Sequence, residues 1–359
     1  MPAAAPAGAE LGQPASGEAS GSRRKLFVLI GIAAVVAAIA VVAAVRFLPL
    51  GGSQQQQNPP AEAKPPSVVT TIAMGVGPDG VAISPDGSRA WITDNNGDTI
   101  FTIDTATNTV INKLENVDPI GIAVTPDGKR LYVPNLGPNT VTVIDTASNA
   151  VSATVPVGDG PVRVIINSDG SRAYISNRDS GNVSVIDTGS NDVIETIDVA
   201  DRPDRFRFTP DGSRLYVTSP ETDQMSIIDP AANKLVTTFP LKGVPFTQIF
   251  NTDGTRTYIT NLGGNTLSVL DVANNAVIST IPVGAGPLAV VATPDFSRLF
   301  VTNIDGGTVS VINVADSKVI ATLDAGQRPS DAAITPDGKR LYLTNQTGSV
   351  TVIDTGVGG

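Results

Sequence analysis

The stretch SPDGSRAWITDN, residues 84–95, is the key to the architecture because the chain contains seven versions of it. It joins two short apolar runs through a tight turn, and the second run carries an aromatic residue. The other versions are TPDGKRLYVPN from Thr125, NSDGSRAYISN from Asn167, TPDGSRLYVTS from Thr209, NTDGTRTYITN from Asn251, TPDFSRLFVTN from Thr293 and TPDGKRLYLTN from Thr335. From Asp86 to Asp337 the turn aspartates are spaced by 41 residues once and by 42 residues five times. Such a period predicts an array of equivalent structural units.

Each unit contains four short apolar runs, which predicts four β-strands. In Ser84–Gly87, Pro and Gly occupy the second and fourth positions of a type I turn, where their backbone preferences fit. Val, Ile, Thr and Tyr dominate the runs, Gly, Pro, Asn and Asp separate them, and no 3.6-residue period is sustained. Four strands in about 42 residues are typical of a propeller blade. We therefore predict an all-β fold, a seven-bladed β-propeller with four-stranded antiparallel blades.

The seventh unit lacks its outermost strand, because the chain ends soon after the third apolar run of that unit. The sequence SVVTTIAM, residues 67–74, matches the outer strands of other units, such as VVTTFPL and VISTIPV. Pairing this segment with the last strand would complete the seventh blade and remove an open sheet edge. We predict that an N-terminal outer strand closes the ring in this way.

Three segments precede the repeats. Residues 1–25 are mostly Ala, Gly, Pro and Ser and end in three basic residues, so we predict a disordered cytoplasmic tail. Residues 26–45 carry no charge, and these 20 residues are long enough for one transmembrane helix that anchors the chain. Residues 46–66 are rich in Pro and Gln and are predicted to be a linker to the propeller at residues 67–359. A cleavable signal peptide is the alternative for the apolar segment.

The charges around the apolar segment predict its orientation. Arg23, Arg24 and Lys25 precede it and only Arg46 follows closely, which favours a cytoplasmic N-terminus. We therefore predict a single-pass protein of the cell membrane with an extracytoplasmic propeller, either periplasmic or at the cell surface.

Several motifs resemble one repeat family. The strands LYVTS (215–219) and LYLTN (341–345), the Pro-Asp-Gly turn and VSVIDT (183–188) are similar to the YVTN family of β-propeller repeats. The resemblance covers residues 67–359. It implies a bacterial or archaeal surface or periplasmic protein, in agreement with the predicted anchor. A propeller fold by itself does not specify an activity.

The composition excludes several kinds of chemistry. There is no Cys and no His, so thiol nucleophiles, imidazole bases and imidazole metal sites are all excluded for this chain. The formal charge is −10, and residues 67–359 are net acidic, which makes binding to nucleic acid unfavourable. We predict no cofactor and no metal site.

Functional residues are expected where the repeat is broken. The second residue after the proline that precedes each first strand reads Gly80, Gly121, Arg163, Arg205, Thr247, Ala289 and Asp331. These residues would line the central channel, and Arg202, Arg207, Phe246 and Gln248 are further departures nearby. The seven candidate site residues are thus Arg163, Arg202, Arg205, Arg207, Phe246, Gln248 and Asp331. One hypothesis is a small anionic ligand at the channel mouth, held by guanidinium groups and faced by Asp331 from the opposite blade. The alternative is that the arginines pair with Asp159, Asp201 and Asp204.

For function, the sequence favours a non-catalytic binding or scaffold module. Its partner would be a protein or a component of the cell envelope, bound by the loop face of the propeller. The alternative is an enzyme that resembles propeller lactonases or quinoprotein dehydrogenases, against which the lack of His and Cys counts.

Overall fold

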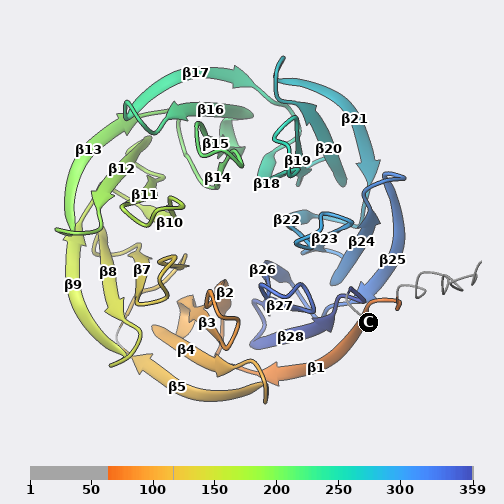
Figure 1. Ribbon diagram of the computed structural model, residues 1–359, viewed down its shortest axis with the longest axis horizontal. Helices are drawn as coiled ribbons and strands as arrows, with labels where there is room; N and C mark the ends of the chain where they lie inside the picture. Colours follow the sequence, from red (N-terminus) through yellow and green to blue (C-terminus); the bar gives the residue numbers. More distant parts are fainter. Residues whose placement is uncertain (1–63, 116, 358–359) are drawn as a thin grey trace, which may run out of the picture. The chain divides into compact units, whose positions relative to one another are not determined.

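The computed structural model describes residues 64–115 and 117–357, and this part of the chain folds as a ring of seven four-stranded antiparallel sheets (Figure 1). The sheets stand side by side around a central axis, and one strand of each sheet lies nearest to that axis. The prediction of an all-β, seven-bladed propeller is therefore confirmed.

The strands fall into four concentric sets. The innermost strands are β2 (Pro78–Ile83), β6 (Ala123–Val124), β10 (Pro161–Ile166), β14 (Phe206–Phe208), β18 (Pro245–Phe250), β22 (Pro287–Ala292) and β26 (Pro329–Ile334). The second set is β3 (Arg89–Asp94), β7 (Arg130–Asn135), β11 (Arg172–Asn177), β15 (Leu215–Ser219), β19 (Arg256–Asn261), β23 (Arg298–Asn303) and β27 (Arg340–Asn345). The third set is β4 (Thr99–Asp104), β8 (Thr140–Asp145), β12 (Asn182–Asp187), β16 (Gln224–Asp229), β20 (Thr266–Asp271), β24 (Thr308–Asn313) and β28 (Ser349–Asp354). The outer strands are β5 (Thr109–Glu115), β9 (Ala150–Pro156), β13 (Asp192–Asp198), β17 (Lys234–Pro240), β21 (Ala276–Pro282), β25 (Lys318–Asp324) and β1 (Ser67–Ala73). Short 3₁₀ turns lie at Asn95–Gly97 and Pro220–Thr222.

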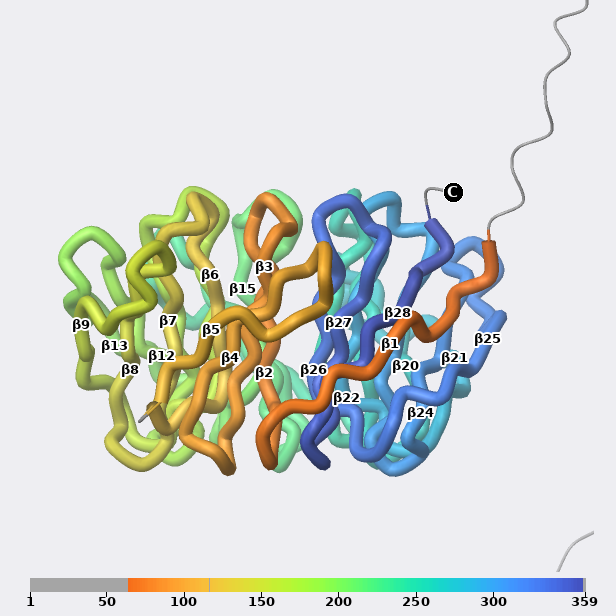
Figure 2. Tube along the Cα trace, turned by 90° about the horizontal axis from the view of Figure 1, so that it is seen from below, coloured from red at the N-terminus to blue at the C-terminus, as the bar shows by residue number. Residues whose placement is uncertain are grey.

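The N-terminal strand β1 completes the last blade. It pairs antiparallel with β28, with Ser67 opposite Asp354 and Ala73 opposite Ser349, and the sheet order is β1-β28-β27-β26 (Figure 2). The predicted ring closure is therefore confirmed. Strand β28 gains a partner along its outer edge, so the seventh blade has four strands like the others.

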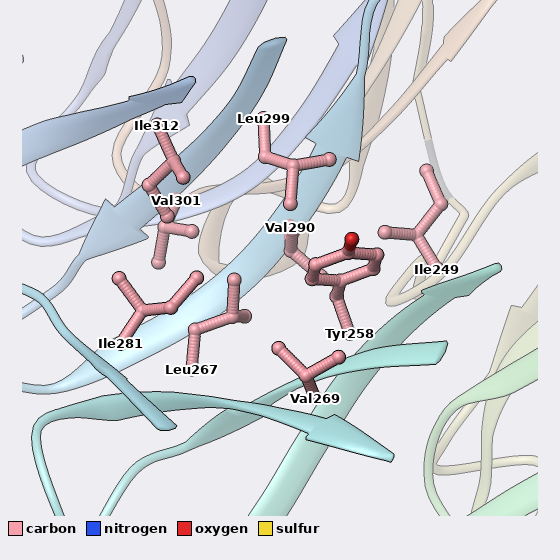
Figure 3. Packing of buried hydrophobic residues seen from close by; sticks show 9 residues of the cluster. All are labelled: Ile249, Tyr258, Leu267, Val269, Ile281, Val290, Leu299, Val301 and Ile312. Carbon is pink, nitrogen blue, oxygen red and sulfur yellow. The ribbon is translucent and has the colours of Figure 1, made fainter. Parts of the chain in front are cut away.

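The hydrophobic core lies between neighbouring blades. Figure 3 shows the interface of the fifth and sixth blades, where Tyr258 and Leu267 meet Val290 and Leu299. The aromatic residue of each second strand occupies this position around the ring, and these side chains are almost fully buried. Some also reach the next blade: the hydroxyl of Tyr342 donates a hydrogen bond of 2.6 Å to Oδ1 of Asn108. The repeated aromatic residues are therefore structural.

Each Pro-Asp-Gly turn is closed by its own side chains. In the first blade the hydroxyl groups of Ser84 and Ser88 donate to Asp86, and the amide of Ser88 does so too. The hydrogen bond from the Ser84 hydroxyl is the largest cause that lowers the pKa of Asp86 to about 2. These hydrogen bonds favour the ionised carboxylate and explain why Asp is repeated at this position.

The predicted cytoplasmic tail, transmembrane helix and most of the linker lie outside the described residues. Within residues 64–115 and 117–357, no helix has the length and apolar character needed to cross a bilayer. The predicted anchor, orientation and location therefore stay predictions.

Candidate functional site in the central channel

Two columns of side chains follow the channel wall along the innermost strands. The first column, nearer the start of each strand, contains the predicted set from Gly80 to Asp331. The second column lies two residues further along and reads Ala82, Ala123, Ile165, Arg207, Ile249, Val291 and Ala333. Six of its seven members are small or apolar, so Arg207 is the one charged residue in this column.

The first column forms an ion-pair cluster across the channel. Nη1 of Arg163 lies 3.0 Å from a carboxylate oxygen of Asp79, and Nη1 of Arg205 lies 3.2 Å from Asp331. Both arginines also approach Asp204, at 3.9 Å and 3.5 Å. Arg205 and Asp331 therefore meet across the channel, as the blade order predicts. These pairs belong to side chains that are less than one fifth exposed, so solvent screens them weakly.

The partners of the arginines differ partly from those the sequence suggests. Asp204 is a partner, but Asp159 instead accepts a hydrogen bond from Asn139, and the ion pairs of Arg163 and Arg205 do not include Asp201. Asp79 was missed by the sequence reasoning. Asp79 directly follows the proline that begins the innermost strand. Among the seven residues at this position, one per blade, only Asp79 and Asp204 are acidic, and this departure from the repeat could have identified Asp79.

The pKa of Arg163 reflects this cluster. Burial acts to lower the pKa of the guanidinium, and the carboxylates of Asp79, Asp331 and Asp204 more than offset that effect. The net result is a pKa above the ordinary value of an arginine. The charges of Arg163 and Arg205 are thus already opposed by acidic partners, although several of their buried guanidinium nitrogens donate no hydrogen bond within the described residues.

Three other predicted residues have separate positions. Arg202 lies outside the channel, where it forms ion pairs with Glu221 and Asp179. The ring of Phe246 lies under the guanidinium of Arg205, 5.3 Å from its central carbon. The side chain of Gln248 is buried and donates through Nε2 to the backbone oxygen of Tyr216. Phe246 and Gln248 therefore support the channel wall, and Arg202 belongs to a separate, partly exposed group of ion pairs.

Arg207 differs from the other channel arginines. It forms no ion pair and donates no side-chain hydrogen bond to any residue that the structure describes. Burial lowers the pKa of its guanidinium, and the only opposing charge of note is Asp331, which is already paired with Arg205. The side chain is partly buried and borders the cavities of the channel, so its charge is partly desolvated, and without a partner such a charge costs the fold stability. Among the described arginines of the channel wall, Arg207 is therefore the one whose charge is not already opposed by a paired carboxylate.

Arg207 faces two cavities that meet at this side chain and at Ile165. The inner cavity has a volume of about 180 Å³ and lies among the ion pairs. The outer cavity, of about 770 Å³, opens on the side of the ring that carries the Pro-Asp-Gly turns. We call it the turn-side cavity, and its lining includes Tyr174, Arg207, Phe208, Phe250 and Phe296. Its volume lies in the ordinary range for organic ligands.

The turn-side cavity was not predicted, and its clearest sign in the sequence is Phe296. This residue replaces the glycine of the Pro-Asp-Gly turn in the sixth blade and has φ = 56°, a left-handed conformation that is unfavourable for a bulky residue. In five of the other six blades a Cβ atom would crowd a proline of the preceding turn: at Gly87 it would lie 3.2 Å from Cδ of Pro336. The fifth blade has Thr252 in place of that proline, which leaves room for Phe296. Strained residues of this kind are concentrated at functional sites.

Comparison with known proteins gives the family. The family described as Cytochrome D1 heme domain matches residues 80–356, which is nearly the whole propeller. The chain belongs to this family. Its fold is also similar to a solved chain of Kuenenia stuttgartiensis Hydrazine Synthase, with a TM-score of 0.73 and 23% identity over 79% of this chain and 97% of that chain. Identity at this level shows the shared fold alone. No curated protein sequence is detectably similar.

Membership in the Cytochrome D1 heme domain family corrects two predictions. The prediction of a non-catalytic scaffold is wrong, because the family is defined by a heme domain and so points to a redox protein with a cofactor. The prediction of a protein or cell-envelope partner on the loop face is wrong for the same reason. The propeller repeat itself is confirmed, whereas the YVTN assignment stays a prediction.

The residues of this chain fit the macrocycle of a heme but not the common ligation of its iron. Proteins hold heme iron through His, Cys, Met or Tyr, and the chain contains neither His nor Cys. The donor set therefore does not fit the common ligation of the iron. The turn-side cavity fits the macrocycle, because aromatic side chains suit its faces and Arg207 suits its carboxylates.

Proposed function

We propose that this chain binds a carboxylate-bearing tetrapyrrole of the heme type in the turn-side cavity and serves in a redox protein. Three observations support the proposal. The chain belongs to the Cytochrome D1 heme domain family, the cavity of about 770 Å³ suits an organic ligand, and Arg207 supplies an unpaired positive charge at its inner end. The charge of Arg207 carries the argument, since the family name alone gives no position for the ligand.

The contacts expected for this ligand follow from the lining. Aromatic side chains prefer offset or edge-to-face contacts with other rings, and Tyr174 and Phe208 already adopt an edge-to-face arrangement at 5.5 Å. A carboxylate on the macrocycle would accept two parallel hydrogen bonds from the guanidinium of Arg207. Such a pairing would also remove the cost of leaving that charge without a partner.

The proposal is tested by titrating the full-length chain with hemin and recording the visible absorbance. The variant Arg207→Gln removes the charge, and Arg214→Gln is the matched control. Arg214 lies in the same blade but pairs with Asp229 at 3.3 Å and is 42% exposed. Loss of a charge-assisted hydrogen bond of about 1.5–3 kcal/mol predicts a rise in Kd of roughly 10- to 100-fold for Arg207→Gln and none for the control. Equal affinity in both variants, or no binding by the unmodified chain, would contradict the proposal.

A further inference from the structure

We propose that this chain holds a tetrapyrrole by its faces and carboxylates and gives no ligand to the central metal, so that the metal-free macrocycle binds as well as heme. The inference rests on the proposed function, because it concerns the same cavity. It goes further in assigning the class of ligand: the shape and charge of the macrocycle are recognised, and the metal is not. The evidence comes from each type of side chain that could act as a donor.

The nitrogen and sulfur donors can be considered first. The sequence contains no His and no Cys. Among the described residues, Met225 is fully buried in the cluster that joins the fourth and fifth blades. Met74 packs against the cluster that joins the seventh and first blades. Neither methionine is among the residues that line the turn-side cavity. Thioether, thiolate and imidazole ligation are thus all missing at this site.

Tyrosine is the remaining common donor, and Tyr174 is the one that lines the cavity. Its hydroxyl is buried and has no hydrogen-bond partner among the described residues. The equivalent hydroxyl of Tyr342 donates a hydrogen bond to Asn108 of the next blade. For Tyr174 the corresponding asparagine is Asn233, but its Oδ1 accepts a hydrogen bond of 3.0 Å from Nη1 of Arg172 instead. Burial raises the pKa of Tyr174, which opposes formation of the phenolate that would bind a metal. Tyr174 is fully buried in the core between the blades, so its oxygen is not exposed to the cavity as a donor.

The acidic residues of the cavity are also occupied. Asp169 accepts a hydrogen bond from the amide of Ser171, and Asp211 accepts from the hydroxyl of Thr209 and the amide of Ser213. These contacts close the Pro-Asp-Gly turns and are repeated all around the ring. They are structural contacts, so the two carboxylates are not positioned for a metal.

What remains is a lining that recognises rings and negative charge. Phe208 and Phe296, which are partly exposed, supply aromatic surface, and Arg207 supplies the cation. Phe296 is notable because its left-handed backbone, with φ = 56°, costs stability. Its cost is explained if the ring completes the aromatic wall that faces a macrocycle. These interactions are independent of the metal at the centre of the ring.

The test compares hemin with metal-free protoporphyrin IX by isothermal titration calorimetry on the full-length chain. We expect the two Kd values to agree within about threefold, and Phe296→Gly to weaken both to the same extent. The electron paramagnetic resonance spectrum of bound hemin is expected to be unchanged in Tyr174→Phe. Gly87→Ala is a matched control for the turn change, because Gly87 is the turn glycine of the first blade, has a similar positive φ of 74° and is not among the residues that line the turn-side cavity.

The outcomes separate this inference from the proposed function. The inference would be overturned if hemin bound more than tenfold tighter than the metal-free macrocycle and Tyr174→Phe changed either that ratio of Kd values or the spectrum of bound hemin. Such a result would identify a protein ligand to the metal, and the proposed function would still stand. Failure of both compounds to bind would overturn both proposals. Equal binding of the two compounds, with both lost in Arg207→Gln, supports both.

Discussion

Replacing Arg207 with isoleucine is expected to stabilise the ligand-free propeller. Isoleucine is the residue at the same column position in the third and fifth blades, where Ile165 and Ile249 stand. Arg207 has no ion-pair partner among the described residues, and burial lowers the pKa of its guanidinium. The net penalty for a desolvated ion in a protein is several kcal/mol, and Arg207 keeps contact with the channel, so we expect a gain of about 1–3 kcal/mol. For a domain of this size that raises the Tm by roughly 2–5 °C.

The matched variant Arg205→Leu is expected to have the opposite effect. Arg205 pairs with Asp331 at 3.2 Å and approaches Asp204 at 3.5 Å, and its removal would leave two largely buried carboxylates without that partner. The expected loss is about 3–5 kcal/mol. Chemical denaturation of both variants, monitored by circular dichroism, measures whether each free energy of unfolding rises or falls. Destabilisation by Arg207→Ile of 1 kcal/mol or more would show that Arg207 is a structural residue and would refute the reasoning.

Three other predictions concern the ring itself. Deletion of β1, residues 67–73, should lower the Tm of the full-length chain because β28 loses its partner; an unchanged melting curve would show that closure contributes nothing. Hydrogen bonds from hydroxyl groups of their own turns lower the pKa of Asp86 and Asp211 from 3.8 to about 2. The ionised carboxylates therefore stabilise the fold at pH values above the unfolded pKa. Denaturation at stepped pH should show that this contribution is lost as the pH falls from about 4 through about 2. Tyr342→Phe should cost about 1 kcal/mol, whereas Tyr174→Phe, whose hydroxyl has no partner, should cost nothing measurable; equal losses in chemical denaturation would contradict the assignment.

The ring could be predicted from the sequence because the same local interactions require the same residue types at the same positions in every blade. Each Pro-Asp-Gly turn requires Asp for hydrogen bonds within the turn, and each second strand requires an aromatic residue for the interface with the next blade. These requirements recur at 41- or 42-residue intervals, so they reveal the blade boundaries directly. The closing strand could be recognised at residues 67–74 because it repeats the pattern of the other outer strands.

The candidate site was only partly predictable, because it depends on contacts between blades. Departures from the repeat located Arg163, Arg205, Arg207 and Asp331, but they could not show which of these residues form ion pairs in the fold. The structure separates them, because Asp79 of the first blade pairs with Arg163, Asp331 pairs with Arg205, and Arg207 has no ion pair among the described residues. Sequence reasoning also weighed only one mouth of the channel.

The turn-side cavity shows most clearly what sequence reasoning lacked. Phe296 is visible in the sequence as a missing glycine, but its meaning depends on Thr252, which replaces a proline in the preceding blade. The two substitutions are 44 positions apart in the sequence. Their connection is visible only in the structure, where the turns of neighbouring blades lie side by side. The functional prediction was wrong for a related reason, because a propeller fold does not determine what its channel holds.

The most direct test of the central claim, that Arg207 is kept for a ligand at a cost in stability, is thermal melting with and without hemin. For the unmodified chain, hemin at about 100 times its Kd should add about 2.7 kcal/mol and raise the Tm accordingly. Arg207→Ile should have the higher Tm without hemin and gain little when hemin is added. Equal hemin-induced shifts in the two proteins would contradict the account.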